Sequence, residues 1–150
     1  WERWDGEKTD STFQDEGMNS FNHYAYGAIG DWMYRVVAGI EIGSAGYKKI
    51  LIQPHPDRRL TYAKALYESV YGAIASGWKI KDGNIMLDVT IPGNTTATIR
   101  LPLTQIDKIK ENGKDLSAAF KIIKQAGNDV EIEVGSGTYN FIYPAGFVSK

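Results

Sequence analysis

Cysteine is absent from this 150-residue chain, and histidine occurs only twice. The absence of cysteine excludes disulfide bonds as a source of stability, but it fits a cytosolic and a periplasmic protein equally. Two separated histidines without cysteine make a catalytic zinc site a poor expectation. The sequence therefore gives no indication of a bound metal or another cofactor.

The chain also lacks a long apolar run and an excess of charge of either sign. No stretch approaches the roughly 20 apolar residues that a membrane-spanning helix requires. The formal net charge of −1 gives no electrostatic reason to expect nucleic acid or an anionic membrane as a partner. Apolar residues still make up 43% of the sequence, which is ordinary for a globular protein with a packed core. At this length we expect one domain, or one domain with a piece of another.

Apolar residues recur with helical spacing near the N-terminus. They follow the i, i+3, i+4, i+7 pattern of one buried helix face for five turns. The set is Phe21, Tyr24, Ala25, Ala28, Ile29, Trp32, Met33, Val36, Val37 and Ile40. Asn19 or Ser20 can cap the start of the helix, and Gly39 can take the left-handed conformation at its end. The spacing predicts one long helix over residues 21–40.

The opposite side of this predicted helix carries small and aromatic residues, namely His23, Gly27, Gly30 and Tyr34. A glycine inside a helix costs about 1 kcal/mol relative to alanine. We therefore expect another segment to press close against the two glycines. A helix buried on two sides needs neighbours, and the chain shows no other strong helical pattern.

From residue 47 onward the apolar period changes from 3.6 to 2, which is typical of β-strands. Strands are expected at 47–53, 61–69, 72–81, 84–91, 95–101, 106–111, 118–124, 130–134 and 138–143. The stretch 118–124 also fits a short helix, although we favour a strand. Asp82-Gly83 and Asn112-Gly113 are typical two-residue hairpin turns. So many short strands at regular spacing predict an antiparallel β-sandwich.

The glycine-rich stretch 39–46 is the expected domain junction. We place one domain at 1–42, which holds a loop and the helix, and a β-sandwich domain at 43–150. The expected fold class is therefore mainly β, an antiparallel β-sandwich preceded by one long α-helix.

Indole rings and carboxylates are mixed at the start of the chain, at Trp1, Glu2, Trp4 and Asp5. Flat apolar rings cover the C–H face of a pyranose, and carboxylates bind its hydroxyls or transfer protons. This combination is typical of a sugar-binding site.

Several motifs together resemble the end of the catalytic domain of bacterial α-L-rhamnosidases. They are Trp-Glu-Arg-Trp-Asp at 1–5, Phe-Gln-Asp at 13–15, Gly-Met-Asn-Ser-Phe-Asn-His-Tyr-Ala-Tyr-Gly at 17–27, Asp-Trp at 31–32, Gly-Tyr-Lys-Lys-Ile at 46–50, Leu-Thr-Tyr-Ala-Lys-Ala at 60–65 and Asp-Val-Thr-Ile-Pro at 88–92. The resemblance runs to about residue 101. It implies that the predicted helix is left over from an (α/α)6 catalytic barrel, which a small C-terminal β-sandwich follows in this family.

The resemblance also implies roles for particular residues. Glu2 matches the family's general base, and His23 matches the histidine that contacts the bound sugar. Apart from the resemblance, Trp1 and Trp4 are candidates for walls of the site, with a place in the core as the alternative. The family's general acid lies upstream, in sequence that this chain does not contain, so we expect the isolated chain to be inactive. Many family members use calcium near the sugar, but no loop of oxygen ligands here indicates it.

The partners implied by the resemblance are a rhamnose-containing carbohydrate and the upstream catalytic barrel of the same protein. Because the chain begins inside a motif, we expect it to be part of a longer enzyme. For that enzyme the bacterial periplasm or secretion is favoured, with the cytoplasm as an alternative. Without the barrel, the apolar stripe would face water, so we expect self-association through residues 21–40.

Two further functions remain open for the sandwich. It would bind carbohydrate itself if exposed aromatic side chains formed a row on one sheet face, and the candidates are Tyr62, Tyr67, Tyr71 and Trp78. Alternatively, the sandwich is a purely structural domain that supports the barrel.

Overall fold

The computed structural model describes residues 6–15, 17, 25, 27–116 and 120–146. The chain divides into two compact units, Trp1–Asp31 and Trp32–Lys150. In the first unit, Glu7 pairs with Phe13 in a single antiparallel β-bridge. The Asp10 carboxylate accepts hydrogen bonds from the backbone N–H and the hydroxyl of Thr12, and these bonds lower the pKa of Asp10.

The helical segment in the described residues ends earlier than the sequence predicts. It consists of α1, Ala28–Trp32, and the π-helical turn η3, Met33–Val37. Gly39 has a φ of +78°, which confirms the predicted left-handed residue after the helix. The predicted end at Ile40 is wrong, because Ile40 begins strand β1. The predicted start at residue 21 lies outside the described residues.

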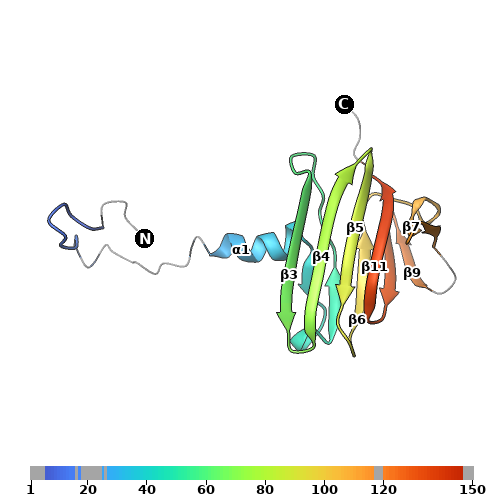
Figure 1. Cartoon of the computed structure of the whole chain (residues 1–150), viewed down its shortest axis with the longest axis horizontal. Coiled ribbons are helices and arrows are strands. Elements are labelled where there is room, and N and C mark those ends of the chain that lie inside the picture. The colour runs from blue at the N-terminus through green and yellow to red at the C-terminus, as the bar shows by residue number, and fades with distance from the viewer. Residues whose placement is uncertain (1–5, 16, 18–24, 26, 117–119, 147–150) are drawn as a thin grey trace. The chain divides into compact units, whose positions relative to one another are not determined.

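The strands form two sheets (Figure 1). The five-stranded sheet has the order β1-β2-β6-β10-β9. Its strands are β1 Ile40–Ile42, β2 Lys49–Ile52, β6 Thr96–Leu101, β10 Asp129–Val134 and β9 Lys121–Ala126. The six-stranded sheet has the order β3-β4-β5-β11-β7-β8. Its strands are β3 Tyr62–Ser69, β4 Gly72–Lys81, β5 Asn84–Ile91, β11 Gly137–Pro144, β7 Lys110–Glu111 and β8 Lys114–Asp115.

Strand pairing among the described residues is antiparallel, with one exception. Strand β2 runs parallel to β6, with Lys49 opposite Thr96 and Ile52 opposite Ile99. Short 3-10 turns, η4 Ala45–Tyr47 and η5 Ile106–Lys108, occupy the ends of two stretches that the sequence predicts as strand. The stretch 118–124 fits both a strand and a short helix by sequence. Strand β9, Lys121–Ala126, confirms the strand for its described part.

The core lies between the two sheets and consists mainly of branched aliphatic side chains. They alternate with outward-facing residues along each strand, as the period of 2 predicts. The most deeply buried large side chains are Trp78, Tyr143, Phe141, Ile40, Ile50, Ile52, Ile74, Ile85, Leu87, Ile99, Leu101 and Ile109. The predicted fold class, an antiparallel-rich β-sandwich preceded by a helix, is confirmed.

Both predicted hairpin turns are confirmed by their backbone geometry. Asp82 and Gly83 have φ values of +50° and +74°, and Asn112 and Gly113 have +49° and +78°. Positive φ at both central residues defines the turn type that matches the twist of the flanking strands. The first turn joins β4 to β5, and the second joins β7 to β8.

Candidate functional site

The four residues expected to form the sugar site, Trp1, Glu2, Trp4 and His23, lie outside the described residues. Their proposed roles therefore stay predictions. The expected domain boundary between residues 42 and 43 also stays a prediction. What the structure does describe is the point where the helical segment meets the sandwich.

Four consecutive backbone carbonyls, those of residues 36–39, accept hydrogen bonds from the sandwich and the loop after β2. The indole N–H of Trp78 donates to Val37 at 2.7 Å, and the hydroxyl of Ser76 donates to Ala38 at 2.6 Å. The other two donors are backbone groups. The N–H of His55 donates to the carbonyl of Val36 at 3.2 Å, and the N–H of Gln53 donates to that of Gly39 at 2.8 Å. We call this set of four bonds the carbonyl clamp.

The sequence produces the clamp because Ser76 and Trp78 occupy inward positions of β4. Their neighbour in the alternation is Ile74, and all three side chains are buried. The last carbonyls of a helix have no partner within the helix, so an external donor is needed when they are buried. Sequence reasoning missed this role. The signal that was available is a tryptophan on an inward strand position, since a buried indole N–H needs an acceptor.

An apolar groove of about 590 Å³ lies beside the clamp. One wall comes from η3 and the residue before it, and the other from the loop between β2 and β3. The lining residues are Trp32, Met33, Val36, Val37, His55, Asp57, Arg59 and Leu60. Trp32, Met33 and Leu60 are 49%, 54% and 42% exposed, which is unusual for large apolar side chains grouped together. The groove therefore presents uncovered apolar surface.

The charged rim of this groove is held by a local ion pair. The Asp57 carboxylate accepts hydrogen bonds from the backbone N–H and the Nε of Arg59, each at 2.8 Å. The side-chain hydrogen bond from Arg59 is the main cause that lowers the pKa of Asp57 to about 2.

The four candidate aromatic residues do not form the exposed row that carbohydrate binding by the sandwich would require. Trp78 is only 2% exposed and belongs to the core, whereas Tyr62 is 64% exposed. Tyr62 and Tyr67 differ by five positions along β3, so their side chains point to opposite faces of that strand. Tyr67 instead packs against Tyr47, with 4.6 Å between ring centroids, and Tyr71 lies under the ammonium group of Lys48. These aromatics cannot act together as a flat sugar platform.

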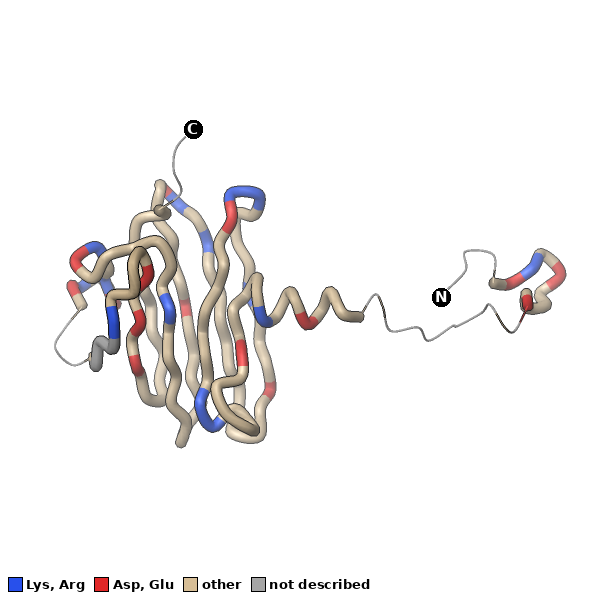
Figure 2. The backbone as a smooth tube through the Cα atoms, turned by 180° about the vertical axis from the view of Figure 1, so that it is seen from behind, with Lys and Arg blue, Asp and Glu red and all other residues tan. Residues whose placement is uncertain are grey.

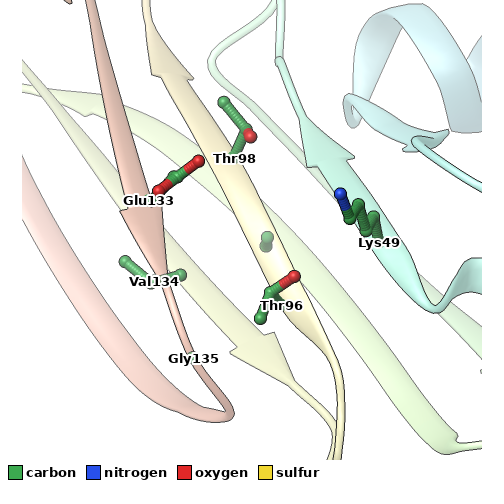
Figure 3. Close-up of a pocket in the computed structure, with 7 residues that line it drawn as sticks. Lys49, Thr96, Thr98, Glu133, Val134 and Gly135 are labelled. Atoms are coloured by element: carbon green, nitrogen blue, oxygen red, sulfur yellow. The ribbon is translucent and has the colours of Figure 1, made fainter. Parts of the chain in front are cut away.

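A polar hollow of about 370 Å³ lies on the outer face of the five-stranded sheet. Figure 3 shows Thr96 and Thr98 on β6, between Lys49 on β2 and Glu133 on β10. Two threonines of one strand and a charged side chain from each neighbouring strand line this hollow. A cation, a carboxylate and two hydroxyls together can donate hydrogen bonds to a small neutral polyol and accept hydrogen bonds from it.

Acidic and basic residues are interspersed over the whole sandwich (Figure 2).

Two absences hold for the described residues. Among them, no group of three or more His, Asp or Glu side chains is arranged to hold a metal ion. In the same part of the chain, no helix is both long and apolar enough to cross a membrane.

Comparisons with known proteins give the two parts of the chain a common origin. Residues 39–115 match the bacterial alpha-L-rhamnosidase C-terminal domain, and residues 1–37 match the bacterial alpha-L-rhamnosidase 6 hairpin glycosidase domain. An alpha-L-rhamnosidase of Streptomyces avermitilis is 38% identical over 94% of this chain, and one of Formosa agariphila is 43% identical over 94%. The chain spans only 13% and 15% of the length of these two relatives.

Solved structures agree with the sequence comparisons. The Streptomyces avermitilis alpha-L-rhamnosidase complexed with L-rhamnose superposes with a TM-score of 0.75 and 37% identity, covering 95% of this chain and 13% of that one. The alpha-L-rhamnosidase from Dictyoglumus thermophilum gives a TM-score of 0.73 and 30% identity, covering 89% and 15%. The helical segment and the β-sandwich thus occur together in larger enzymes, and the chain belongs to the bacterial α-L-rhamnosidase family, of which it represents a C-terminal portion.

Proposed function

We propose that this chain is the C-terminal part of an α-L-rhamnosidase, here called the parent enzyme, that removes terminal α-L-rhamnosyl residues from glycosides or polysaccharides. The observation that carries the proposal is the match of residues 1–37 to the glycosidase domain, which includes the Trp-Glu-Arg-Trp motif. In this proposal His23 holds hydroxyls of the sugar ring, and Trp1 and Trp4 shield the cleft.

The proposed reaction is hydrolysis with inversion at the anomeric carbon. An upstream carboxylic acid donates a proton to the glycosidic oxygen, and the bond from that oxygen to the anomeric carbon breaks. Glu2 takes a proton from a water molecule on the opposite face of the ring, and the water oxygen bonds to the anomeric carbon. Two carboxyl groups in such a pair stand about 6.5–9.5 Å apart, which leaves room for the water.

The test of Glu2 uses the parent enzyme with Glu2→Gln. Loss of the general base raises the barrier of the chemical step, so kcat should fall by a factor of about 10² to 10⁴ while KM changes little. The first product formed by the wild type should be the inverted anomer, which proton NMR detects directly. Near-normal turnover of Glu2→Gln, or a retained configuration in the product, would remove Glu2 from this role.

The sugar contact of His23 is tested separately. His23→Ala in the parent enzyme should weaken inhibition by free L-rhamnose by about 1–3 kcal/mol, because a sugar hydroxyl loses its buried partner. An unchanged inhibition constant would leave His23 with a structural role only.

For the sandwich itself we propose a supporting role. The apolar groove beside η3 favours it, because Trp32, Met33 and Leu60 offer a surface that an upstream helix of the barrel would cover. Removing the sandwich from the parent enzyme should then lower its stability strongly while any folded remainder keeps its affinity for rhamnose.

A second candidate, weak sugar binding by the sandwich, is favoured by the polar hollow in Figure 3. The hollow offers hydrogen-bonding groups but no flat ring, so millimolar affinity is the most it supports. NMR titration of the 150-residue chain with L-rhamnose tests this candidate. Saturable shifts confined to the amides of β2, β6 and β10, and lost in Thr98→Val, would support it. A spectrum that does not change would exclude it.

A further inference from the structure

The carbonyl clamp depends on two particular side chains. The bonds from His55 and Gln53 come from backbone N–H groups, which nearly any residue supplies. The bonds to Val37 and Ala38 come from the indole of Trp78 and the hydroxyl of Ser76. Half of the clamp is therefore specified by the identity of two residues on one strand.

Packing alone does not require a serine and a tryptophan at positions 76 and 78. Ser76 and Trp78 are 1% and 2% exposed, and aliphatic or aromatic side chains without a donor would fill the same inward positions. A buried hydroxyl or indole N–H costs free energy unless it is hydrogen-bonded. Because hydrogen bonds weaken steeply when they are misaligned, the two bonds fix the direction of the helix end as well as its place.

The segment that they fix is the last part of the glycosidase region. The match to the 6 hairpin glycosidase domain ends at residue 37, and the clamp acts on the carbonyls of residues 36–39. The match to the C-terminal domain begins at residue 39 and contains both side-chain donors. The bonds to the carbonyls of Val36 and Val37 thus join the two parts of the family's sequence, and the bond from Ser76 to Ala38 holds the residue between them.

We propose that Ser76 and Trp78 are positioning residues of the parent enzyme. They set the direction of the helical segment Trp32–Val37, which ends the part of the sequence that matches the glycosidase domain. The proposal rests on the proposed function and extends it, since it gives the sandwich a part in catalysis. A displacement of about 1 Å in a catalytic constellation can cost roughly a hundredfold in rate.

The test compares matched variants of the parent enzyme. Ser76→Ala and Trp78→Phe remove one donor each and keep most of the side-chain volume. The control is Tyr143→Phe, which removes a hydroxyl that is equally buried in the sandwich but has no hydrogen-bond partner among the described residues. Ser76→Thr is the rescue variant, because it restores a hydroxyl at the same position.

We expect kcat to fall at least about tenfold in Ser76→Ala and in Trp78→Phe, with KM nearly unchanged, because positioning acts on the transition state. Tyr143→Phe should keep wild-type kinetics, and Ser76→Thr should recover most of the lost rate. All assays are run well below the melting temperature of each variant. Unchanged kcat in both donor variants, or an equal loss in Tyr143→Phe, would overturn the proposal.

Hydrogen–deuterium exchange of the 150-residue chain gives a readout that does not depend on activity. Exchange of the amides of Ala38 and Gly39 should become faster in Ser76→Ala, and the amides of β5 and β11 should not change. Identical exchange in the variant and the wild type would show that the clamp does not hold the helix end. A parent enzyme without rhamnosidase activity would instead contradict the proposed function, and the exchange result would then decide the clamp alone.

Discussion

Tyr143 is a large residue of the buried core. It is 1% exposed, and its hydroxyl has no hydrogen-bond partner among the described residues. A buried hydroxyl without a partner carries a desolvation cost that phenylalanine avoids. We expect Tyr143→Phe to leave the free energy of unfolding unchanged or raise it by up to about 1 kcal/mol. Urea denaturation measures this, and a clear loss of stability would reveal a partner of the hydroxyl.

The same residue makes a prediction about alkaline pH. Burial, and secondarily the charge of Asp129, raises the pKa of Tyr143 well above its usual value. Above about pH 10 the unfolded chain therefore releases this proton while the folded chain still holds it. The free energy of unfolding should fall as the pH rises beyond 10, and it should fall less steeply in Tyr143→Phe. Tyr62→Phe, at an exposed position, is the control and should keep the wild-type slope.

Gly39 is a position where the backbone accepts no side chain. Its φ is +78°, and a Cβ atom there would lie 2.1 Å from the backbone nitrogen of Pro54. We expect Gly39→Ala to lower the free energy of unfolding by at least about 2 kcal/mol, from left-handed strain plus the clash. The control is Gly83→Ala, which has a φ of +74° but open space around the added Cβ. Equal losses in the two variants would mean that the neighbouring Pro54 moves aside easily.

At the scale of elements, the strands were predictable, whereas the end and the burial of the helix were not. Apolar residues alternate along 84–91 and 96–101, and their Ile, Leu and Val side chains are buried as predicted. Both sheets that bury them are formed by this chain itself. The apolar period of 21–40 is equally regular, yet none of the residues of α1 and η3 is buried. The sequence also predicts close packing at Gly30, but among the described residues nothing lies within 4 Å of a Cβ added there.

The end of the helix is set by contacts that no local pattern encodes. Ile40 continues the helical spacing, but its backbone pairs with Ile52 in the five-stranded sheet. The carbonyls before it are taken by donors 38 and 41 positions away in sequence. Period alone therefore extended the helix by three residues. In the candidate site, the inward position of Trp78 indicates that its indole needs an acceptor, but it does not indicate that the acceptor is Val37.

The exposed apolar groove predicts self-association of the isolated chain. Trp32→Ser combined with Met33→Ser should shift an oligomer toward monomer, because the two side chains supply much of the uncovered apolar surface. Light scattering measures the change in mass. Tyr62→Ser with Leu66→Ser, also exposed but on the outer face of β3, is the matched control. A wild-type chain that is already monomeric would contradict the prediction.

Truncation is a less informative test of the same idea. A chain that starts at Gly43 loses strand β1 and Gly39 together with the helix. Any change in its mass would then mix the loss of the apolar stripe with damage to the five-stranded sheet. The paired substitutions keep both sheets intact.

At the scale of the molecule, we expect the isolated chain to show no hydrolysis of nitrophenyl rhamnoside. The chain spans 13% of the length of its Streptomyces relative, and the proposed general acid lies in the missing part. Removing the acid abolishes protonation of the leaving group, and removing the barrel abolishes the positioning of substrate. The assay should run beside the parent enzyme at equal molar concentration. Measurable turnover by the chain alone would overturn the assignment of the acid.

The family and the sandwich could be read from the sequence because motifs and alternation are local. The strand with which each strand pairs could not be predicted in this way. Alternation in 47–53 predicts a strand, but nothing in that stretch indicates that β2 lies parallel to β6 instead of beside its neighbour β3. Pairing is decided by which assembly of all strands buries the most apolar surface, and that is a property of the whole chain.

The parallel pair of β2 and β6 has a consequence for the order of folding. Because β2 needs β6 beside it, the N-terminal strands cannot join their sheet until a chain segment about fifty positions later has been synthesised and folded. Contacts between distant segments form late, since the intervening loop must be closed first. The clamp on residues 36–39 needs β4 and β2 in place. During synthesis on a ribosome, the hydrogen bonds to the end of the helix would therefore be the last in this region to form. They would form well after the residues of the helix had left the exit tunnel.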